Sequence, residues 1–341
     1  MGTSKALRLG SSICLLALAA CGGGGGNAAP PTTPVVPPPV VPTVSIAAPA
    51  TTNVAGFSGA NVGTNFTTNL PPVGTIISLA GATVSANSTS VADANIRRIT
   101  ATYRGTVTSG GLAYPVFDLS VPELSLTASN VRGDGTPLTL ANGGQISTAT
   151  AAMTYTLMSA WSYAPPGGGT AYLGQMVTGY STPSAAVPAS GTAVYSGNIG
   201  TPGGGGAGGV YFVPSGTGTI QIGALTGNVS INVDFATNKS SGTFSNMMAT
   251  PAGSTTSTPW NTVLLSGSLD RNSSGASIGG MTTTTGAPAN AGAAGFSSAA
   301  TGSYGGSVYG PAAQEVGGSW TLAEPNIING KAAFGTFGAA K

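Results

Sequence analysis

The sequence predicts an all-β protein whose C-terminal part closes into a small antiparallel barrel. From residue 44 onward the chain shows no convincing apolar period of 3.6 residues, which argues against helices. Short runs alternate apolar and polar residues instead. Residues 229–235 (VSINVDF) are an example, and their register places every apolar side chain on one face of a strand. Glycine, proline, asparagine and aspartate separate these runs, as expected of turns between strands.

The chain begins with a pattern typical of an export signal. Basic residues precede an apolar run at 9–20, which is too short to cross a bilayer. The motif at 18–21 (LAAC) resembles a bacterial lipoprotein processing site. This resemblance implies that residues 1–20 are a lipoprotein signal peptide and that Cys21 is lipidated as the first residue of the mature chain. We therefore expect a lipid-anchored protein of the cell outer membrane.

Residues 21–43 are expected to form a tether between the lipid and the folded part. The glycine run at 22–26 is flexible, and residues 30–42 hold seven prolines in thirteen positions. An extended polyproline segment rises about 3.1 Å per residue, so this part alone reaches roughly 40 Å. Such a spacer would hold the folded part away from the lipid headgroups.

The composition excludes several classes of function. The chain contains no histidine, which removes histidine-based triads, histidine acid/base catalysis and the usual axial ligand of haem or zinc. Loss of Lys5 and Arg8 with the signal peptide leaves eight basic and eight acidic residues, so no cationic surface for nucleic acid is expected. No cysteine remains for a disulfide once Cys14 is removed and Cys21 is lipidated. We expect no enzyme activity, no resident cofactor or metal, and no nucleic-acid partner.

The N-terminal half of the folded part, residues 44–178, is expected to contain five strands. Asn142-Gly143 is a strong hairpin signal, because both central residues of a type I′ turn need a positive φ. This turn should join residues 138–140 to residues 145–147. The five expected strands cover residues 75–79, 96–107, 116–121, 144–150 and 153–162.

The C-terminal half, residues 179–341, is expected to supply the barrel. Eight or nine strands in about 150 residues, without helices to cover an open sheet, favour closure because closure removes exposed edges. At eight strands the interior is filled by side chains. The glycine-rich residues 202–209 are expected to be a mobile connection, and Asn329-Gly330 a second tight turn. The expected strands cover residues 192–197, 217–223, 228–235, 241–247, 262–270, 276–283, 300–304, 318–322 and 331–337.

Several motifs of this half resemble one protein family. Residues 179–197 (GYSTPSAAVPASGTAVYSG) are similar to the Gly-Tyr-x-Thr-Pro entry to the barrel domain of transferrin-binding protein B-like lipoproteins. Residues 233–244 resemble the central Asp-Phe and Gly-Thr pair of that domain. Residues 308–320 (VYGPAAQEVGGSW) and 333–339 (AFGTFGA) are similar to its Tyr-Gly-Pro-x-Ala-x-Glu-Val-Gly-Gly and terminal Phe-Gly segments. The matches follow the family order across residues 179–341.

The resemblance implies a lipoprotein exposed on the outer-membrane surface, with a handle-like β domain over 44–178 and an eight-stranded antiparallel barrel over 179–341. Relatives bind host iron proteins, haem or complement factors, often beside a TonB-dependent receptor. The expected function is therefore binding of a solute or host macromolecule, such as an iron carrier or haem. A TonB-dependent receptor and a surface-lipoprotein exporter are further expected partners. The alternative is a structural or adhesive surface lipoprotein with no role in nutrient uptake.

Aromatic residues of the first half are the candidate ligand contacts. Tyr155, Trp161, Tyr163 and Tyr172 lie close together in the sequence, and aromatic anchors dominate binding hot spots. The alternative is that these side chains belong to the core or to a sheet face, where aromatic residues at strand spacing are common.

Three further motifs have simpler explanations. Residues 275–279 (GASIG) fit the Gly-x-Ser-x-Gly elbow, but that motif needs a strand-to-helix turn and a histidine base. Residues 132–134 (RGD) match an adhesion tripeptide, although Asp134-Gly135 also reads as turn punctuation. Asp118, Glu123 and Asp134 are too few and too irregular for a calcium loop.

The only basic cluster consists of Arg97, Arg98 and Arg104. In a segment that alternates apolar and polar residues, such a cluster predicts a solvated strand face rather than an anion site.

Overall fold

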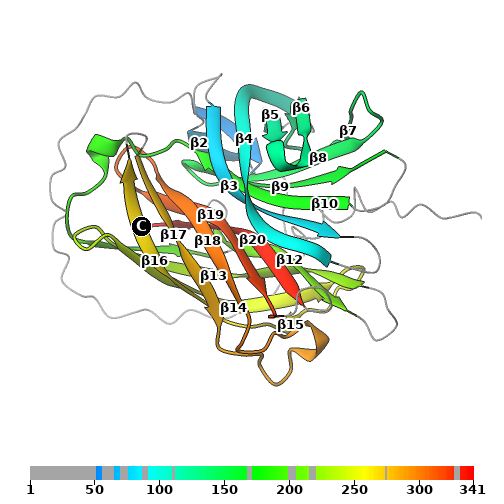
Figure 1. Cartoon of the computed structure of the whole chain (residues 1–341). Helices are drawn as coiled ribbons and strands as arrows, with labels where there is room; N and C mark the ends of the chain where they lie inside the picture. The colour runs from blue at the N-terminus through cyan, green and yellow to red at the C-terminus, as the bar shows by residue number, and fades with distance from the viewer. Residues whose placement is uncertain are drawn as a thin grey trace, which may run out of the picture.

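The computed structural model contains two β-sheets and is shown in Figure 1. The predicted signal peptide, the lipidation of Cys21 and the tether lie outside the described residues, as does the Asn329-Gly330 turn. Side chains of residues 51–99 are likewise outside the description. The structure describes residues 51–55, 65–69, 76–86, 91–109, 112–166, 171–198, 205–214, 220–272, 275–325 and 331–341.

Strands account for nearly all regular structure in these ranges, which confirms the all-β prediction. The helical elements described are three short 3-10 turns: η1 (Pro122–Leu124), η2 (Ser184–Ala186) and η3 (Gly292–Ala294). None of the helices in this part of the chain has the length and apolar character needed to span a membrane.

The second sheet is an eight-stranded closed antiparallel barrel, as predicted. Its ring closes where β20 pairs with β12 and where β13 pairs with β14. β11 (Thr192–Gly197) lies along β13, and β15 (Thr258–Pro259) pairs with β14. The eight barrel strands are β12 (Gly206–Pro214), β13 (Ile220–Asp234), β14 (Lys239–Pro251), β16 (Val263–Asn272), β17 (Gly275–Thr284), β18 (Thr301–Tyr309), β19 (Glu315–Ala323) and β20 (Ala332–Ala340).

Aromatic side chains fill the barrel interior. Phe244 lies at the centre of this packing, with its ring centroid 5.5 Å from those of both Trp320 and Phe337. Trp260 lies between Pro259 and Val263, in the connection to the next strand. Its ring packs near that of Trp320, and its indole N–H donates to the carbonyl of Ala294. These large rings pack with many aliphatic side chains into one continuous barrel core.

The first sheet, here called the handle sheet, curls nearly onto itself. The strand order is β2-β1-β5-β4-β3-β10-β9-β8-β7, with β6 beside β5. A bridge between Asp134 and Ala149 joins the chain just after β6 to β8. The strands are β1 (Thr51–Ala55), β2 (Asn65–Asn69), β3 (Ile76–Ala86), β4 (Val91–Ser109), β5 (Leu112–Val121), β6 (Leu126–Arg132), β7 (Leu138–Thr139), β8 (Gln145–Ala152), β9 (Thr156–Ala164) and β10 (Ala171–Gly179).

The handle sheet packs against the outer face of the barrel along β19 and β20. β3, β4, β9 and β10 all contact these two barrel strands, and Figure 1 shows the two sheets lying against each other. β19 and β20 are buried on both faces as a result. β9 also has two buried faces: Trp161 faces the handle core and Met158 faces the barrel.

Small residues allow this close approach. A Cβ atom added to Gly317 of β19 would lie 2.8 Å from the Thr156 methyl carbon. One added to Gly338 of β20 would lie 2.6 Å from the sulfur of Met153. Side chains at these two positions would push the handle sheet away from the barrel.

The hairpin at Asn142-Gly143 is confirmed, since Leu138 pairs with Ile146 across it. The type I′ geometry is not, because Gly143 has a positive φ and Asn142 does not, and the Gly143 N–H donates to the carbonyl of Leu140. The prediction of a mobile connection over residues 202–209 is wrong for its second half, because β12 begins at Gly206. A Cβ atom on Gly209 would lie 2.3 Å from the carbonyl oxygen of Phe334. Glycine at this position permits two backbones to approach, so glycine content here does not indicate a loop.

Two other strand predictions are corrected. β13 is one strand of 15 residues where two, at 217–223 and 228–235, were expected. β10 was not expected at all. Its apolar residues, such as Leu173 and Met176, occur on both faces, because one face meets the handle core and the other meets the barrel. A strand between two cores loses the alternation that marks a half-buried strand.

Candidate binding surface on the handle sheet

Two of the four predicted ligand contacts form a stacked pair. Tyr163 of β9 and Tyr172 of β10 are direct partners in the strand register. Their ring centroids are 6.1 Å apart and the ring planes differ by 23°. Tyr163 is 8% exposed, whereas Tyr172 is only partly buried. The pair therefore closes one end of the handle core with one ring still accessible.

The Asn142-Gly143 turn supports this pair from the neighbouring hairpin. The Asn142 side-chain amide donates to the hydroxyl of Tyr163 at 3.3 Å and accepts from the N–H of Gly144 at 2.9 Å. Gly143 adopts a φ of 81°, which glycine tolerates without strain. A Cβ atom on Gly144 would lie 2.8 Å from the Tyr163 ring. Asn142 was not among the predicted site residues, and its turn motif was the available signal.

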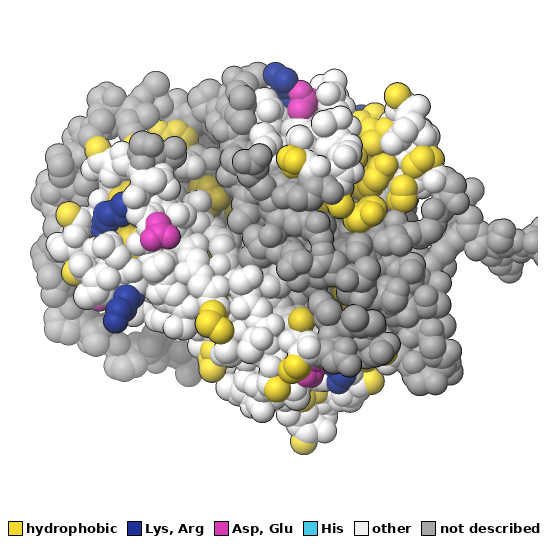
Figure 2. Space-filling view, in the orientation of Figure 1, with side chains coloured by type: hydrophobic (Ala, Val, Ile, Leu, Met, Phe, Trp, Pro, Cys, Tyr) yellow, Lys and Arg dark blue, Asp and Glu magenta, His cyan; other side chains and the backbone are white. Residues whose placement is uncertain are grey.

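Apolar side chains surround the pair. Leu138, Ile146, Tyr163 and Tyr172 follow one another across four paired strands, so they share one face of the sheet. Figure 2 shows hydrophobic side chains gathered over the end of the handle sheet where β7 and β8 lie. We call this the handle-tip surface and define it by Leu138, Leu140, Asn142, Tyr163 and Tyr172, none of which carries a charge.

Trp161 lies in the core of the handle sheet. It is 2% exposed, and its ring covers Gly174 so closely that a Cβ atom there would lie 2.3 Å from it. Of the two interpretations that the sequence allowed, ligand contact or core residue, the structure fits the core residue for Trp161. Trp161 belongs to the same apolar cluster as Tyr163 and Tyr172, but it does not face solvent.

Tyr155 belongs to the contact between the two sheets. Its ring lies 6.5 Å from that of Tyr180, and the Tyr180 N–H donates to its carbonyl at 2.9 Å. Gly310, in the turn between β18 and β19, donates in turn to the carbonyl of Tyr180 at 2.8 Å. The structure thus brings Tyr163 and Tyr172 together and places Tyr155 and Trp161 elsewhere.

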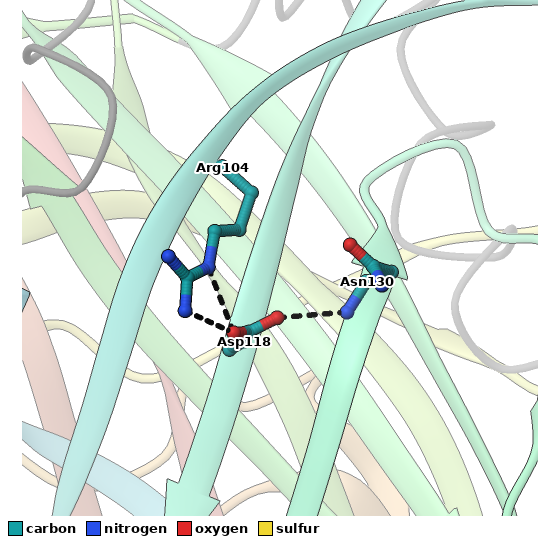
Figure 3. Close-up of polar contacts among 3 residues, drawn as sticks. All are labelled: Arg104, Asp118 and Asn130. Atoms are coloured by element: carbon teal, nitrogen blue, oxygen red, sulfur yellow. Dashed lines mark hydrogen bonds and ion pairs between the residues drawn. The ribbon is translucent and has the colours of Figure 1, made fainter.

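A charged cluster on β4, β5 and β6 is shown in Figure 3. The Arg104 guanidinium contacts one carboxylate oxygen of Asp118, with Nε at 2.8 Å and Nη2 at 2.6 Å. The Asn130 N–H donates to the other oxygen at 2.9 Å. Partial burial raises the pKa of Asp118, but the Asn130 N–H and Arg104 more than offset this, so its pKa lies below the usual value.

This pairing bears on the basic cluster of β4. Arg104 is engaged by Asp118, as expected of a solvated strand face. The side chains of Arg97 and Arg98 lie outside the described residues.

The Arg132-Gly133-Asp134 tripeptide is folded into the sheet. The Arg132 guanidinium pairs with Asp134 at 2.5 Å, and the Asp134 side chain is 4% exposed. Gly133 is buried and its N–H donates to the carbonyl of Pro115. Gly135 follows with a φ of 84°. This geometry fits the turn interpretation, because the aspartate is not presented to a receptor.

The other chemical motifs do not assemble into a centre. Residues 275–279 lie inside β17, so the segment lacks the strand-to-helix turn of a nucleophile elbow. Asp118 and Asp134 are paired with different arginines. Within the described residues no group of three or more His, Cys, Asp or Glu side chains could hold a metal ion.

An open hollow of about 460 Å³ lies on the barrel wall where β11, β13 and β14 meet. Its walls are small and uncharged, and they contain no aromatic ring to anchor a ligand. They are formed by Ser196, Gly197, Asn198, Asn228, Val229, Ser230 and Ser245.

Comparison with known proteins yields one family match and several solved structures. A family model described as the C-lobe and N-lobe β barrels of transferrin-binding protein B matches residues 187–341. Curated proteins give no match. A double mutant of the vaccine antigen transferrin-binding protein B from Haemophilus parasuis Hp5 is 16% identical, covering 82% of this chain and 46% of its own, with a TM-score of 0.40.

Two further solved structures are similar at the same level. Intact Ap-TbpB, with N and C lobes, is 15% identical over 74% of this chain and 63% of its own, with a TM-score of 0.37. Isotype 1 transferrin-binding protein B from serogroup B Neisseria meningitidis is 16% identical over 72% and 53%, with a TM-score of 0.34. This chain spans about half the length of the first structures it matches. The family match over residues 187–341 confirms the resemblance of this barrel to the barrel domains of transferrin-binding protein B.

Proposed function

We propose that this chain is a surface-tethered outer-membrane lipoprotein that binds a solute or host macromolecule through the handle-tip surface. The observation that carries the proposal is the match of residues 187–341 to the barrel domain of transferrin-binding protein B. The family is named for transferrin binding, so an iron-carrier protein is the first candidate ligand and haem the second. A TonB-dependent receptor and a surface-lipoprotein exporter are the proposed partners in the membrane.

The N-terminal sequence supports the tethering half of the proposal. A lipid on Cys21 followed by the proline-rich residues 30–42 would hold the two sheets above the membrane surface. In this arrangement the protein acts by binding through its surface. The sequence has no histidine and no cluster of acidic residues of the kind that catalytic centres use, which agrees with a binding role.

The chemistry of the handle-tip surface supports the binding half. Tyr163 is already held by Asn142 and by stacking on Tyr172, so little side-chain freedom is lost when a partner covers the rings. Because the five defining residues are uncharged, recognition would depend on apolar and aromatic contact more than on electrostatic steering.

A binding panel tests the proposal. The full chain, displayed on cells, is offered iron-loaded transferrin, haem and purified TonB-dependent receptors of the same cell. Saturable binding of at least one probe is expected. If every probe fails to bind, and deletion of the gene alters adhesion but leaves nutrient uptake unchanged, the adhesive alternative replaces this function.

Surface exposure is tested separately by protease treatment of intact cells. The proposal expects the handle sheet and barrel to be digested without lysis. Protection in intact cells, with digestion after lysis, would contradict exposure on the outer face.

A further inference from the structure

Glu315 is a buried carboxylate at the contact between the two sheets. It is the first residue of β19 and is 2% exposed. Val316 and Trp320 point into the barrel core, so Glu315 points outward, toward the handle sheet. Burying a charge in this way is costly unless fixed polar groups replace the lost water.

The hydrogen-bond donors to Glu315 come from one short stretch of the handle chain. The N–H groups of Thr154 and Tyr155 donate to its two oxygens, each at 3.0 Å. The hydroxyl of Thr156 donates to Oε2 at 2.8 Å. Thr154 and Tyr155 join β8 to β9 and Thr156 begins β9, so a single barrel side chain fixes the point at which the handle chain reverses direction.

No positive charge assists these bonds. Within the described part of the chain, Glu315 forms no ion pair with lysine or arginine. Lys341 follows the register partner of Glu315 in β20, but its ammonium lies over the rings of Tyr195 and Phe235. The carboxylate is therefore held by neutral donors alone, and its energy depends on their positions.

The turn between β18 and β19 reinforces the same contact. Tyr309, which pairs with Glu315, donates its hydroxyl to the carbonyl of Val177 in β10 at 3.4 Å. A Cβ atom on Gly310 would lie 2.9 Å from the Tyr155 ring. Through Tyr309 and Val177 on one side and Glu315 and Thr156 on the other, the barrel contacts both strands that carry the stacked tyrosines.

We propose that Glu315 is a positioning residue that locks the connection between β8 and β9 onto the barrel and so fixes the orientation of the handle-tip surface. β9 runs without interruption from Thr156, at the lock, to Tyr163, at the tip. Seven residues of strand span roughly 23 Å at about 3.3 Å per residue. The consequence for ligand binding rests on the proposed function, whereas the lock itself does not.

The lock predicts a specific dependence on pH. Burial raises the pKa of Glu315, and the Thr156, Tyr155 and Thr154 donors offset this only in part. A group with a raised folded pKa stabilises the docked state most when it is protonated, and this stabilisation is lost as pH rises through that pKa. Among the described residues, the other titratable groups facing it are Tyr155 and Tyr309, and burial raises the pKa of Tyr309 above the usual tyrosine value.

Hydrogen exchange of the full chain tests the lock without any ligand. The readout is the protection of the Thr154 and Tyr155 amides, corrected for intrinsic rates, between pH 4.5 and 8. In the wild-type protein, protection is expected to fall as pH rises through the pKa of Glu315. In Glu315→Gln this inflection should disappear, and exchange of one or both amides should be at least tenfold faster than in the wild type at the low-pH end. The reason is that the glutamine NH₂ faces N–H donors.

Two further variants keep the test decisive. Thr156→Val removes one donor to the carboxylate, so the inflection should move to higher pH. Glu324→Gln is the matched control, since Glu324 accepts from Ser297 and makes no contact with the lock. An inflection that persists in Glu315→Gln, or unchanged amide protection in both lock variants, would overturn the proposal. Because no ligand is used, failure of the binding panel leaves this result intact.

Discussion

Single glycines decide where the aromatic rings of this protein can lie. Gly174 leaves the space that the Trp161 ring occupies, and Gly144 leaves space beside Tyr163. In a strand interior glycine is normally unfavourable, because it has no side chain to pack and loses much backbone freedom. Here a ring from the next strand supplies the missing contact, so glycine content reflects packing at these positions.

Gly174→Ala is expected to lower the free energy of unfolding by about 1–3 kcal/mol, because the new methyl group overlaps the Trp161 ring. Gly208→Ala is the matched control, since the nearest atom to its Cβ would be 3.7 Å away. Chemical denaturation followed by Trp fluorescence measures both variants. Equal stability of the two would show that the ring moves aside without cost.

The ion pair of Asp118 with Arg104 makes the stability of the handle sheet depend on pH. Its folded pKa is lowered, so the stabilisation it provides is present above its unfolded pKa and is lost as pH falls through the folded value. Asp118→Asn should therefore reduce stability at pH 7 by less than about 1 kcal/mol, as expected of an exposed pair. Denaturation at pH 7 and pH 3 should give a smaller difference at pH 3. A larger difference at pH 3 would contradict this account of Asp118.

At the scale of elements, the sequence predicted those features that depend on local chemistry. The Asn142-Gly143 turn and β11 were predictable because turn residues and alternation are local signals. β10 and β12 were not predicted. β10 is apolar on both faces, and Gly206 and Gly209 are explained by the neighbouring strand β20. Likewise, the sequence grouped four aromatic residues, but only strand register separates Tyr163 and Tyr172 from Trp161.

The turn between β7 and β8 is expected to control the order of the handle-tip surface. Gly143→Ala places a side chain at a φ of 81°, which costs about 1–2 kcal/mol for a residue other than glycine. Loss of this turn geometry should also weaken the bond from Asn142 to Tyr163. The Tyr163 ring signals in an NMR spectrum should broaden or shift while those of Tyr304, inside the barrel, stay unchanged. Unchanged Tyr163 signals would show that the ring does not need the turn.

At the scale of the whole molecule, two sheets share the surface of β19 and β20. The barrel core on one side and the handle sheet on the other bury every residue of these strands except the last of each, and Gly317 and Gly338 permit the contact. The handle sheet therefore has a fixed base on the barrel. The aromatic pair lies at the far end of β9 from this base, where a partner can reach it.

The central claim is that this aromatic end binds a partner at the cell surface, and one affinity comparison tests it most directly. Cells displaying the full chain are titrated with labelled iron-loaded transferrin and with haem. Wild type, Tyr172→Ala and Met281→Ala are compared, the last truncating a side chain that is 59% exposed on the barrel wall. We predict that Tyr172→Ala weakens binding at least tenfold, as expected of a hot-spot aromatic, while Met281→Ala binds as the wild type does. Wild-type affinity in Tyr172→Ala, or no binding of either probe by the wild-type protein, would contradict the claim.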